Sequence, residues 1–369
     1  MNSAIVTEAI EVLKQYKEGG TKIVGVVQHG IFPDELVVAA GAIPIRLILG
    51  GKDEQEIGDQ YLSATTCPYG RATLGFLEEK DPLYSLIDTM ILGTFCNGSQ
   101  NVRNYLDNFN IPSITVSIPH TRGDYALKYY LSELKKVKTY LERLTGTQAT
   151  PQSFSDAIKA YNQMRKLLRQ INNYRKLDTP PVRGMTMQEL VWQAFLLGPE
   201  VMIPRCKELL QNLADKPLTY SGTRVFLTGS GITLGDTILE LIEEQCGGLI
   251  VADDLWSSMD YFLEDTTMDG VSPLKALAER YLCRNLCGRM TGEKEIRMPK
   301  ILELYHAFRA SGIIYHTLKF CDSYSNLKPE FKKFMNRHDI PLLDLDRDYA
   351  ESSTGQIKTR VEAFLEMIS

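Results

Sequence analysis

The sequence has no surplus of basic residues, since 41 Lys and Arg stand against 46 Asp and Glu, for a formal net charge of −5. Nucleic-acid binding depends on concentrated positive charge, so this balance argues against a nucleic-acid partner. No apolar run approaches the roughly 18 residues of a membrane span. The first 20 residues form an amphipathic pattern with Glu8 and Glu11, unlike a signal peptide. We therefore expect a cytosolic protein that binds neither nucleic acid nor membrane.

Cysteine is also scarce, and its pattern excludes several kinds of site. Seven cysteines in 369 residues are too few, and odd in number, for a disulfide scaffold. The sequence has no close C-x-x-C pair, which is the usual zinc spacing, although zinc is not excluded. It also has no G-x-S-x-G elbow of the kind that supports Ser-His-Asp catalysis. The cysteines are therefore core residues, reactive thiols or metal ligands, and their positions decide between these roles.

Short β-rich segments alternate with helical ones in both halves of the chain. Such alternation predicts parallel sheets covered by helices on both faces. The segments that we expect to be strands are 23–27, 43–47, 89–93, 114–118, 224–228, 249–252, 313–317 and 341–345. Between the two halves, the 3.6-residue periodicity of 125–144, 154–177, 187–197 and 201–213 predicts helices only. The expected fold is thus α/β, with two Rossmann-like (flavodoxin-like) domains, 1–121 and 217–369, separated by a helical domain, 122–216.

Three cysteines fall where sites form in such a fold, outside the carboxyl ends of the strands. Cys96 and Cys321 each follow a predicted strand and precede a helix, and Cys67 directly precedes Pro68 at another helix start. Free N–H groups and the helix dipole at these positions lower the pKa of a thiol and stabilise negative charge. The alternative is three cysteines buried in loops as small apolar residues. Three equivalent positions favour a metal site, and thiolates that hold an iron–sulfur cluster need this environment.

The remaining cysteines are less clearly placed. Cys283 and Cys287 are spaced i, i+4, so they share a helix face or flank a short loop; they could be two ligands or two core residues. Cys206 lies on an apolar stripe and is expected in the core. Cys246 lies at a helix end before a strand, at the opposite edge of the sheet from Cys321, which favours a structural role.

Other candidates come from loops. Residues 229–236 (GSGITLGD) join a strand to a helix and could bind phosphate through backbone N–H groups, but no Lys follows, and a tight structural turn is an equal alternative. A nucleotide-dependent Rossmann enzyme without iron is the hypothesis that rests on this loop. His29, Glu35 and His316 are candidate proton donors from their positions near strand ends. Glu35 could equally be a helix-start carboxylate, and either histidine a structural residue.

Several stretches of the sequence resemble the motifs of one family. They are Phe32-Pro33-Asp34-Glu35-Leu36 with Ala39-Ala40-Gly41, then Thr66-Cys67-Pro68, Phe95-Cys96-Asn97 and Lys319-Phe320-Cys321-Asp322, and the ending 355–364, GQIKTRVEAF. Through them the chain resembles, over nearly its whole length, the 2-hydroxyacyl-CoA dehydratase superfamily. This superfamily includes ATP-dependent benzoyl-CoA reductase subunits and double-cubane cluster proteins.

The resemblance implies an oxygen-sensitive iron–sulfur protein. A separate homodimeric activator, with its own 4Fe-4S cluster, hydrolyses ATP and delivers an electron at low potential. In the dehydratases, two different subunits each hold a 4Fe-4S cluster through three cysteines, which Cys67, Cys96 and Cys321 match. In the double-cubane proteins, a larger cluster needs about six cysteine ligands.

The cysteine surplus favours the larger cluster. Cys287 resembles an additional family cysteine, and Cys283 lies beside it. Trp256 stands where relatives often have a cysteine, so Cys246 is the nearest spare candidate for a sixth ligand, although its position in the fold argues against it.

If the protein binds iron, the sequence leads to three functional hypotheses. The first is a low-potential iron–sulfur reductase component, a homodimer with a double-cubane 8Fe-9S cluster that reduces small molecules. The second is a 4Fe-4S subunit of a 2-hydroxyacyl-CoA dehydratase or benzoyl-CoA reductase, which pairs with a related subunit and acts on an acyl-CoA thioester. The third is a non-catalytic electron carrier.

Overall fold

The computed structural model describes residues 3–27, 31–215, 219–284, 286–349 and 354–369. It contains two parallel four-stranded sheets with the same relative strand order, β2-β1-β3-β4 and β6-β5-β7-β8. The strands are β1 (Lys22–Val27), β2 (Ala42–Leu47), β3 (Thr89–Gly93), β4 (Ser113–Val116), β5 (Thr223–Gly229), β6 (Gly248–Asp253), β7 (Gly312–Leu318) and β8 (Leu342–Arg347). Each of the eight predicted strand segments is found, so the α/β prediction with two Rossmann-like sheets is confirmed.

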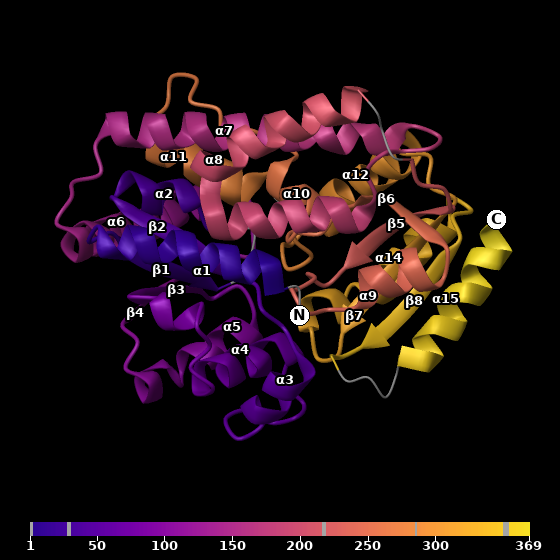
Figure 1. Cartoon of the computed structure of the whole chain (residues 1–369), viewed down its shortest axis with the longest axis horizontal. Helices are drawn as coiled ribbons and strands as arrows, with labels where there is room; N and C mark the ends of the chain where they lie inside the picture. Colours follow the sequence, from indigo (N-terminus) through magenta and orange to yellow (C-terminus); the bar gives the residue numbers. More distant parts are fainter. Residues whose placement is uncertain (1–2, 28–30, 216–218, 285, 350–353) are drawn as a thin grey trace.

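Helices cover both sheets, as the near-continuous burial of the central strands requires. Figure 1 shows the N-terminal sheet on the left and the C-terminal sheet on the right, with α7 and α8 crossing above both. The helices of the first half are α1 (Ser3–Glu18), α2 (Asp34–Ala39), α3 (Lys52–Gly58), α4 (Pro68–Glu78) and α5 (Asn97–Arg103). Those of the second half are α9 (Ile238–Glu240), α10 (Met259–Phe262), α11 (Pro273–Cys283), α12 (Glu293–Ala307), α13 (Asp322–Ser325), α14 (Lys328–Asn336) and α15 (Thr354–Ile368).

The helical stretch between the sheets consists of α6 (Asp124–Thr145), α7 (Pro151–Asn173) and α8 (Gly184–Asp215). The sequence predicts two helices where α8 stands, and the backbone does break there, because Gly198 has a φ of +67° and Pro199 follows it. Helix α8 contacts β2 and β6, and α7 contacts α2 and α11. The helical segment therefore packs on elements of both halves.

The two sheets also meet directly, through the glycine loop that follows β5. Leu234 donates its N–H to the Ile48 carbonyl at 2.7 Å, and Gly50 donates to the Leu234 carbonyl at 2.9 Å. A Cβ on Gly50 would lie 2.1 Å from Thr233 Oγ1, so only glycine allows this approach. The N–H groups of Ser230 and Ile232 are likewise bonded within the protein. These contacts favour the structural-turn interpretation of residues 229–236 over a phosphate loop.

A buried ion pair joins three distant segments of the chain. Arg165 on α7 donates from Nη2 to Glu35 Oε1 on α2 at 2.5 Å, and Tyr281 on α11 donates to Glu35 Oε2 at 2.7 Å. The side chains of Glu35 and Arg165 are both fully buried. Burial alone would raise the pKa of Glu35, but the charges of Arg165 and Arg280 outweigh it and lower the pKa. Glu35 is therefore an ionised structural group.

We expect Glu35→Gln to lower the free energy of unfolding by about 3–5 kcal/mol, because it leaves Arg165 buried without its counter-ion. Urea denaturation at pH 7 measures this loss. The folded-state pKa of Glu35 lies below its unfolded value, so its contribution is present above the unfolded pKa and is lost as the pH falls through the folded pKa. The difference between the variant and the natural protein should therefore shrink in acid.

Glu303→Gln is the matched control, because Glu303 pairs with Lys300 at 2.9 Å and its side chain is 63% exposed. Its expected cost is below about 1 kcal/mol. Equal losses for the two variants would contradict the structural role of the Glu35–Arg165 pair.

Candidate cluster-binding site

Three cysteines precede helices at the carboxyl ends of the strands, as the sequence predicts. Cys96 lies three residues after the end of β3 (Gly93) and Cys321 three residues after the end of β7 (Leu318), and β3 and β7 hold the same place in their sheets. Cys96 directly precedes α5 and Cys321 directly precedes α13. Cys67 precedes α4, where Pro68 occupies the first helical position. The two halves of the chain thus contribute equivalent cysteines.

The fold brings these three cysteines together across the two sheets. Gly98 packs between two of them, because a Cβ there would lie 3.8 Å from Cys67 Sγ and 3.8 Å from Cys96 Sγ. The electrostatic influence of both Cys321 and Cys96 on Cys67 places the third thiol nearby. Asn97 donates from Nδ2 to Asp322 Oδ2 at 2.6 Å, which joins the residue after Cys96 to the residue after Cys321.

Backbone N–H groups surround each sulfur. The donors come from the first turn of the helix that follows each cysteine: Tyr69 and Gly70 for Cys67, Gly98 and Ser99 for Cys96, and Ser323 and Tyr324 for Cys321. Burial nevertheless dominates and raises the pKa of Cys67 and Cys321 above the usual value, and that of Cys96 to about 11. These thiols are costly to ionise alone, yet N–H donors are in place for their ionised form. This combination fits a bound group whose positive charge displaces the protons from the sulfurs.

A buried cation lies beside the same thiols. Arg289 is 7% exposed and donates from Nη2 to the carbonyls of Ile118, at 2.9 Å, and Pro119, at 3.0 Å. Its Nε has no hydrogen-bond partner, and no carboxylate pairs with it, among the residues that the structure describes. Burial lowers the pKa of Arg289, and Cys287 and Cys96 are the first groups that oppose this effect. A buried guanidinium that faces sulfur instead of carboxylate suits a negatively charged sulfur-ligated group.

Within the described part of the chain, no three His, Cys, Asp or Glu side chains are placed to hold one metal ion.

The structure separates Cys283 from Cys287. Helix α11 ends at Cys283, so the two cysteines flank a loop, of which Asn285 lies outside the described residues. Cys287 is 1% exposed, and the next residue, Gly288, packs against the ring of Tyr324, three residues after Cys321. Cys287 thus lies on the side of the three clustered thiols.

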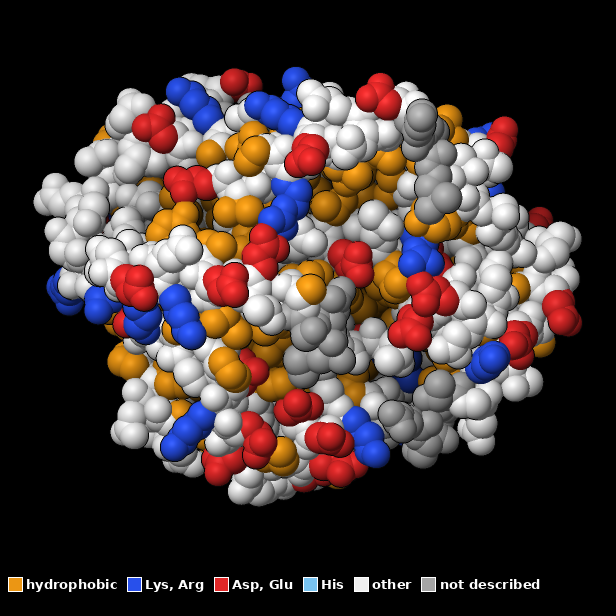
Figure 2. Space-filling model, in the orientation of Figure 1, with side chains coloured by type: hydrophobic (Ala, Val, Ile, Leu, Met, Phe, Trp, Pro, Cys, Tyr) orange, Lys and Arg blue, Asp and Glu red, His pale blue; other side chains and the backbone are white. Residues whose placement is uncertain are grey.

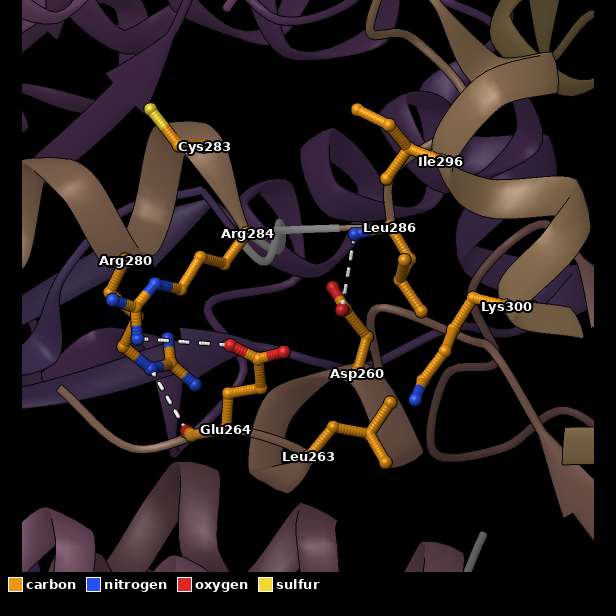
Figure 3. Close-up of a pocket in the computed structure, with 9 residues that line it drawn as sticks. All are labelled: Asp260, Leu263, Glu264, Arg280, Cys283, Arg284, Leu286, Ile296 and Lys300. Carbon is orange, nitrogen blue, oxygen red and sulfur yellow. Dashed lines mark hydrogen bonds and ion pairs between the residues drawn. The ribbon is translucent and has the colours of Figure 1, made fainter. Parts of the chain in front are cut away.

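Cys283 lines a different feature, a pocket of about 310 Å³ between α10, α11 and α12. Figure 3 shows its thiol on the opposite side of this pocket from Lys300, with Asp260 between them. No interaction of Cys283 with Cys67, Cys96 or Cys321 is seen among the described residues; its main neighbours are Gly123 and Arg122. Its predicted role as a ligand finds no geometric support.

The other two cysteines lie away from the site. Cys246 precedes β6, at the amino ends of the strands, and its thiol donates to the Lys358 carbonyl on α15 at 3.9 Å. Because the strands are parallel, this is the end of the sheet opposite Cys321, which argues against Cys246 as a sixth ligand. Cys206 is fully buried on α8, so its prediction as a core residue is confirmed. Trp256, at the position of the expected cysteine, packs its ring on Gly231.

The structure describes the surroundings of two of the three expected proton donors. His29 lies outside the described residues. Glu35 is sealed in its ion pair with Arg165 and is held ionised. His316 is fully buried on β7, where burial and the charge of Arg347 hold its pKa well below the usual value. Arg347 Nη2 lies 3.2 Å from His316 Nδ1. Neither Glu35 nor His316 is therefore suited to exchange protons with a substrate.

Sequence reasoning missed two residues of the site, Arg289 and Ser230. Ser230, in the glycine loop, accepts the N–H of Leu318, three residues before Cys321, on its Oγ at 3.0 Å. The available signals were weak: Arg289 stands two residues after Cys287, and Ser230 stands between two glycines at a strand end. Neither signal says which part of the fold the side chain faces.

Figure 2 shows acidic and basic side chains interspersed over one face of the molecule, without a continuous basic patch on it. Among the described residues, none of the helices has the length and apolarity needed to cross a membrane.

Residues 30–368 match the family described as "2-hydroxyglutaryl-CoA dehydratase, D-component". The (R)-phenyllactyl-CoA dehydratase beta subunit of Clostridium sporogenes is 26% identical over 367 residues, which cover 97% of this chain and 94% of that protein. The beta subunit of (R)-2-hydroxyglutaryl-CoA dehydratase from Acidaminococcus fermentans is 26% identical, with coverage of 96% and 95%. A benzoyl-CoA reductase subunit of Thauera aromatica is 24% identical, with coverage of 88% and 85%.

These similarities confirm the expected resemblance to this superfamily over almost the whole length of the chain. The chain belongs to the 2-hydroxyglutaryl-CoA dehydratase D-component family.

Proposed function

We propose that this chain is an iron–sulfur subunit of a 2-hydroxyacyl-CoA dehydratase or acyl-CoA reductase, and that Cys67, Cys96 and Cys321 hold a 4Fe-4S cluster. The observation that carries the proposal is the convergence of these three cysteines, each supplied with N–H donors from the helix that follows it. Relatives named as dehydratase beta subunits and as a reductase subunit support this choice.

Such a cluster, when bound, supplies one electron at low potential. The role of the protein is to make negative charge on sulfur tolerable away from water. Helix N-termini provide dipoles and N–H groups, and Arg289 provides a full positive charge.

We further propose two protein partners, a second related subunit and an ATP-hydrolysing 4Fe-4S activator. The first is supported by the relatives, which are named as subunits. The second follows from the low potential, because electron transfer to an already negative cluster needs a source of free energy. An acyl-CoA thioester is the proposed substrate of the assembled enzyme.

A homodimeric double-cubane 8Fe-9S reductase is the second candidate, and the position of Cys287 favours it. Cys287 lies on the side of the clustered thiols and shares Arg289 with Cys96, so it could serve as a fourth ligand. The pocket location of Cys283 and the position of Cys246 at the far end of the sheet weigh against a set of six ligands. We therefore prefer the 4Fe-4S cluster held by three cysteines over the double-cubane cluster.

We expect about four irons and four acid-labile sulfides per chain in protein purified without oxygen. Cys67→Ser, Cys96→Ser and Cys321→Ser should each lose most of this iron, because each removes one of three thiolate ligands. Iron and sulfide assays on the folded variants, checked by circular dichroism, measure the loss. Cys246→Ser is the control and should keep its iron.

About eight irons, with a large loss in Cys287→Ser, would instead select the double-cubane candidate. Iron-free natural protein, or variants of the three cysteines that retain as much iron as Cys246→Ser, would contradict both candidates.

We also expect Arg289→Met to shift the midpoint potential of the cluster to a more negative value, since it removes a buried cation beside the sulfurs. Arg289→Lys, which keeps the charge, should shift it less. A redox titration followed by electron paramagnetic resonance measures both. Equal shifts for the two variants would show that the charge of Arg289 does not set the midpoint potential.

A further inference from the structure

The pocket between α10, α11 and α12 is unusual in the number of charged side chains that line it. Its volume is about 310 Å³, at the lower end of the range for ligand pockets, which suits a ligand of a few non-hydrogen atoms. Figure 3 shows Arg280 and Arg284 on the side of the pocket that carries Cys283, Lys300 on the opposite side and Asp260 between them. The charged residues of the lining are Asp260, Glu264, Arg280, Arg284 and Lys300.

Arg280 is a buried cation whose hydrogen bonds go to uncharged groups. It is 7% exposed and donates from Nε to the Glu264 carbonyl at 3.3 Å and from Nη2 to the Tyr261 carbonyl at 2.8 Å. Among the described residues, its Nη1 has no hydrogen-bond partner and its guanidinium forms no ion pair. Burial and the like charge of Arg165 lower the pKa of Arg280. An anion in the pocket would provide this buried charge with a counter-ion.

Two further cations of the lining have only weak partners. Arg284 Nη1 lies 3.8 Å from Glu264 Oε2, and Lys300 Nζ lies 2.9 Å from Glu303 Oε1. The side chains of Glu264 and Glu303 are both exposed. Exposed ion pairs contribute little to stability, so Arg284 and Lys300 can turn to a ligand at small cost.

Asp260 does not cancel these positive charges at neutral pH. Its Oδ1 accepts the N–H of Leu286 at 3.1 Å. Burial raises the pKa of Asp260 to about 7, so near pH 7 much of it is protonated and able to donate a hydrogen to an oxygen atom. The charged and titratable groups around it are Arg280, which lowers its pKa, Asp254 and Glu264, which raise it, and Lys300 and Cys283 across the pocket.

We propose that this pocket binds a small oxyanion with two negative charges, of the class of dicarboxylates and inorganic dianions. Arg280 and Arg284 bind it from one side, because guanidinium groups match the geometry of oxyanions, and Lys300 binds it from the other. Protonated Asp260 donates a hydrogen to it. The inference goes beyond the proposed function and does not depend on whether a cluster is bound.

The test uses Cys283, whose thiol lines the pocket, as a reporter. Full-length protein kept without oxygen is treated with iodoacetamide, and mass spectrometry of the peptides gives the alkylation rate of each cysteine. Succinate and sulfate are the probes, and acetate at the same ionic strength is the blank. At about ten times its dissociation constant, a probe should slow the alkylation of Cys283 about tenfold, because about a tenth of the pockets stay empty. Cys246, which bonds to the Lys358 carbonyl away from the pocket, should keep its rate.

Variants locate the bound anion. Arg284→Gln and Lys300→Gln should each lose most of the protection of Cys283. Lys275→Gln is the matched control, because Lys275 is an exposed cation of α11 that pairs with Glu279, and it should keep the protection. Asp260→Asn keeps an acceptor for the Leu286 N–H, and at pH 8 it should bind the probes more tightly than the natural protein, whose Asp260 is then ionised and repels them.

Protection by succinate at lower concentration than by sulfate supports an extended dicarboxylate, and the reverse order supports a compact dianion. A Cys283 rate that neither probe changes, or equal protection in Arg284→Gln and Lys275→Gln, overturns the inference. If Cys283 does not react in protein without a probe, calorimetric titration of the natural protein and of Arg284→Gln replaces alkylation. No binding by the natural protein, or equal binding by the two, then overturns the inference.

Discussion

The structure depends on one geometric constraint, the meeting of two parallel sheets near the carboxyl ends of their strands. Cys96 and Cys321 occupy equivalent places after β3 and β7, and the bond between Asn97 and Asp322 joins the residues that follow them. The glycine loop and the Leu49–Leu234 bridge hold the two halves in this relation. The buried pair of Glu35 and Arg165 links α2 to the helical segment.

The electrostatics of the site follow from that constraint. Three partly buried thiols brought together resist ionisation, because burial and mutual repulsion both favour the neutral form. Helix N-termini and the Arg289 guanidinium act in the opposite direction. Groups that favour negative sulfur, around thiols that do not ionise readily on their own, fit the positively charged irons of the proposed cluster.

The sequence allows the sheets and the three central cysteines to be predicted, because both depend on local pattern: apolar strand segments, Pro68 at a helix start, and a cysteine soon after a strand. It does not allow the roles of Glu35 and His316 to be predicted. Their partners Arg165 and Arg347 lie 130 and 31 residues away, and only the tertiary structure shows that both side chains are buried beside an arginine. The spacing of Cys283 and Cys287 is equally uninformative, because it does not reveal where α11 ends.

The central claim is that one iron–sulfur cluster is bound where the two sheets meet. The most direct test is an anomalous difference map, recorded at the iron absorption edge, from crystals grown and frozen without oxygen. The account predicts a strong iron peak within bonding distance of Cys67, Cys96 and Cys321 and no peak in the pocket of Cys283. A map without iron between these three sulfurs, from crystals whose protein retains its iron, would contradict it.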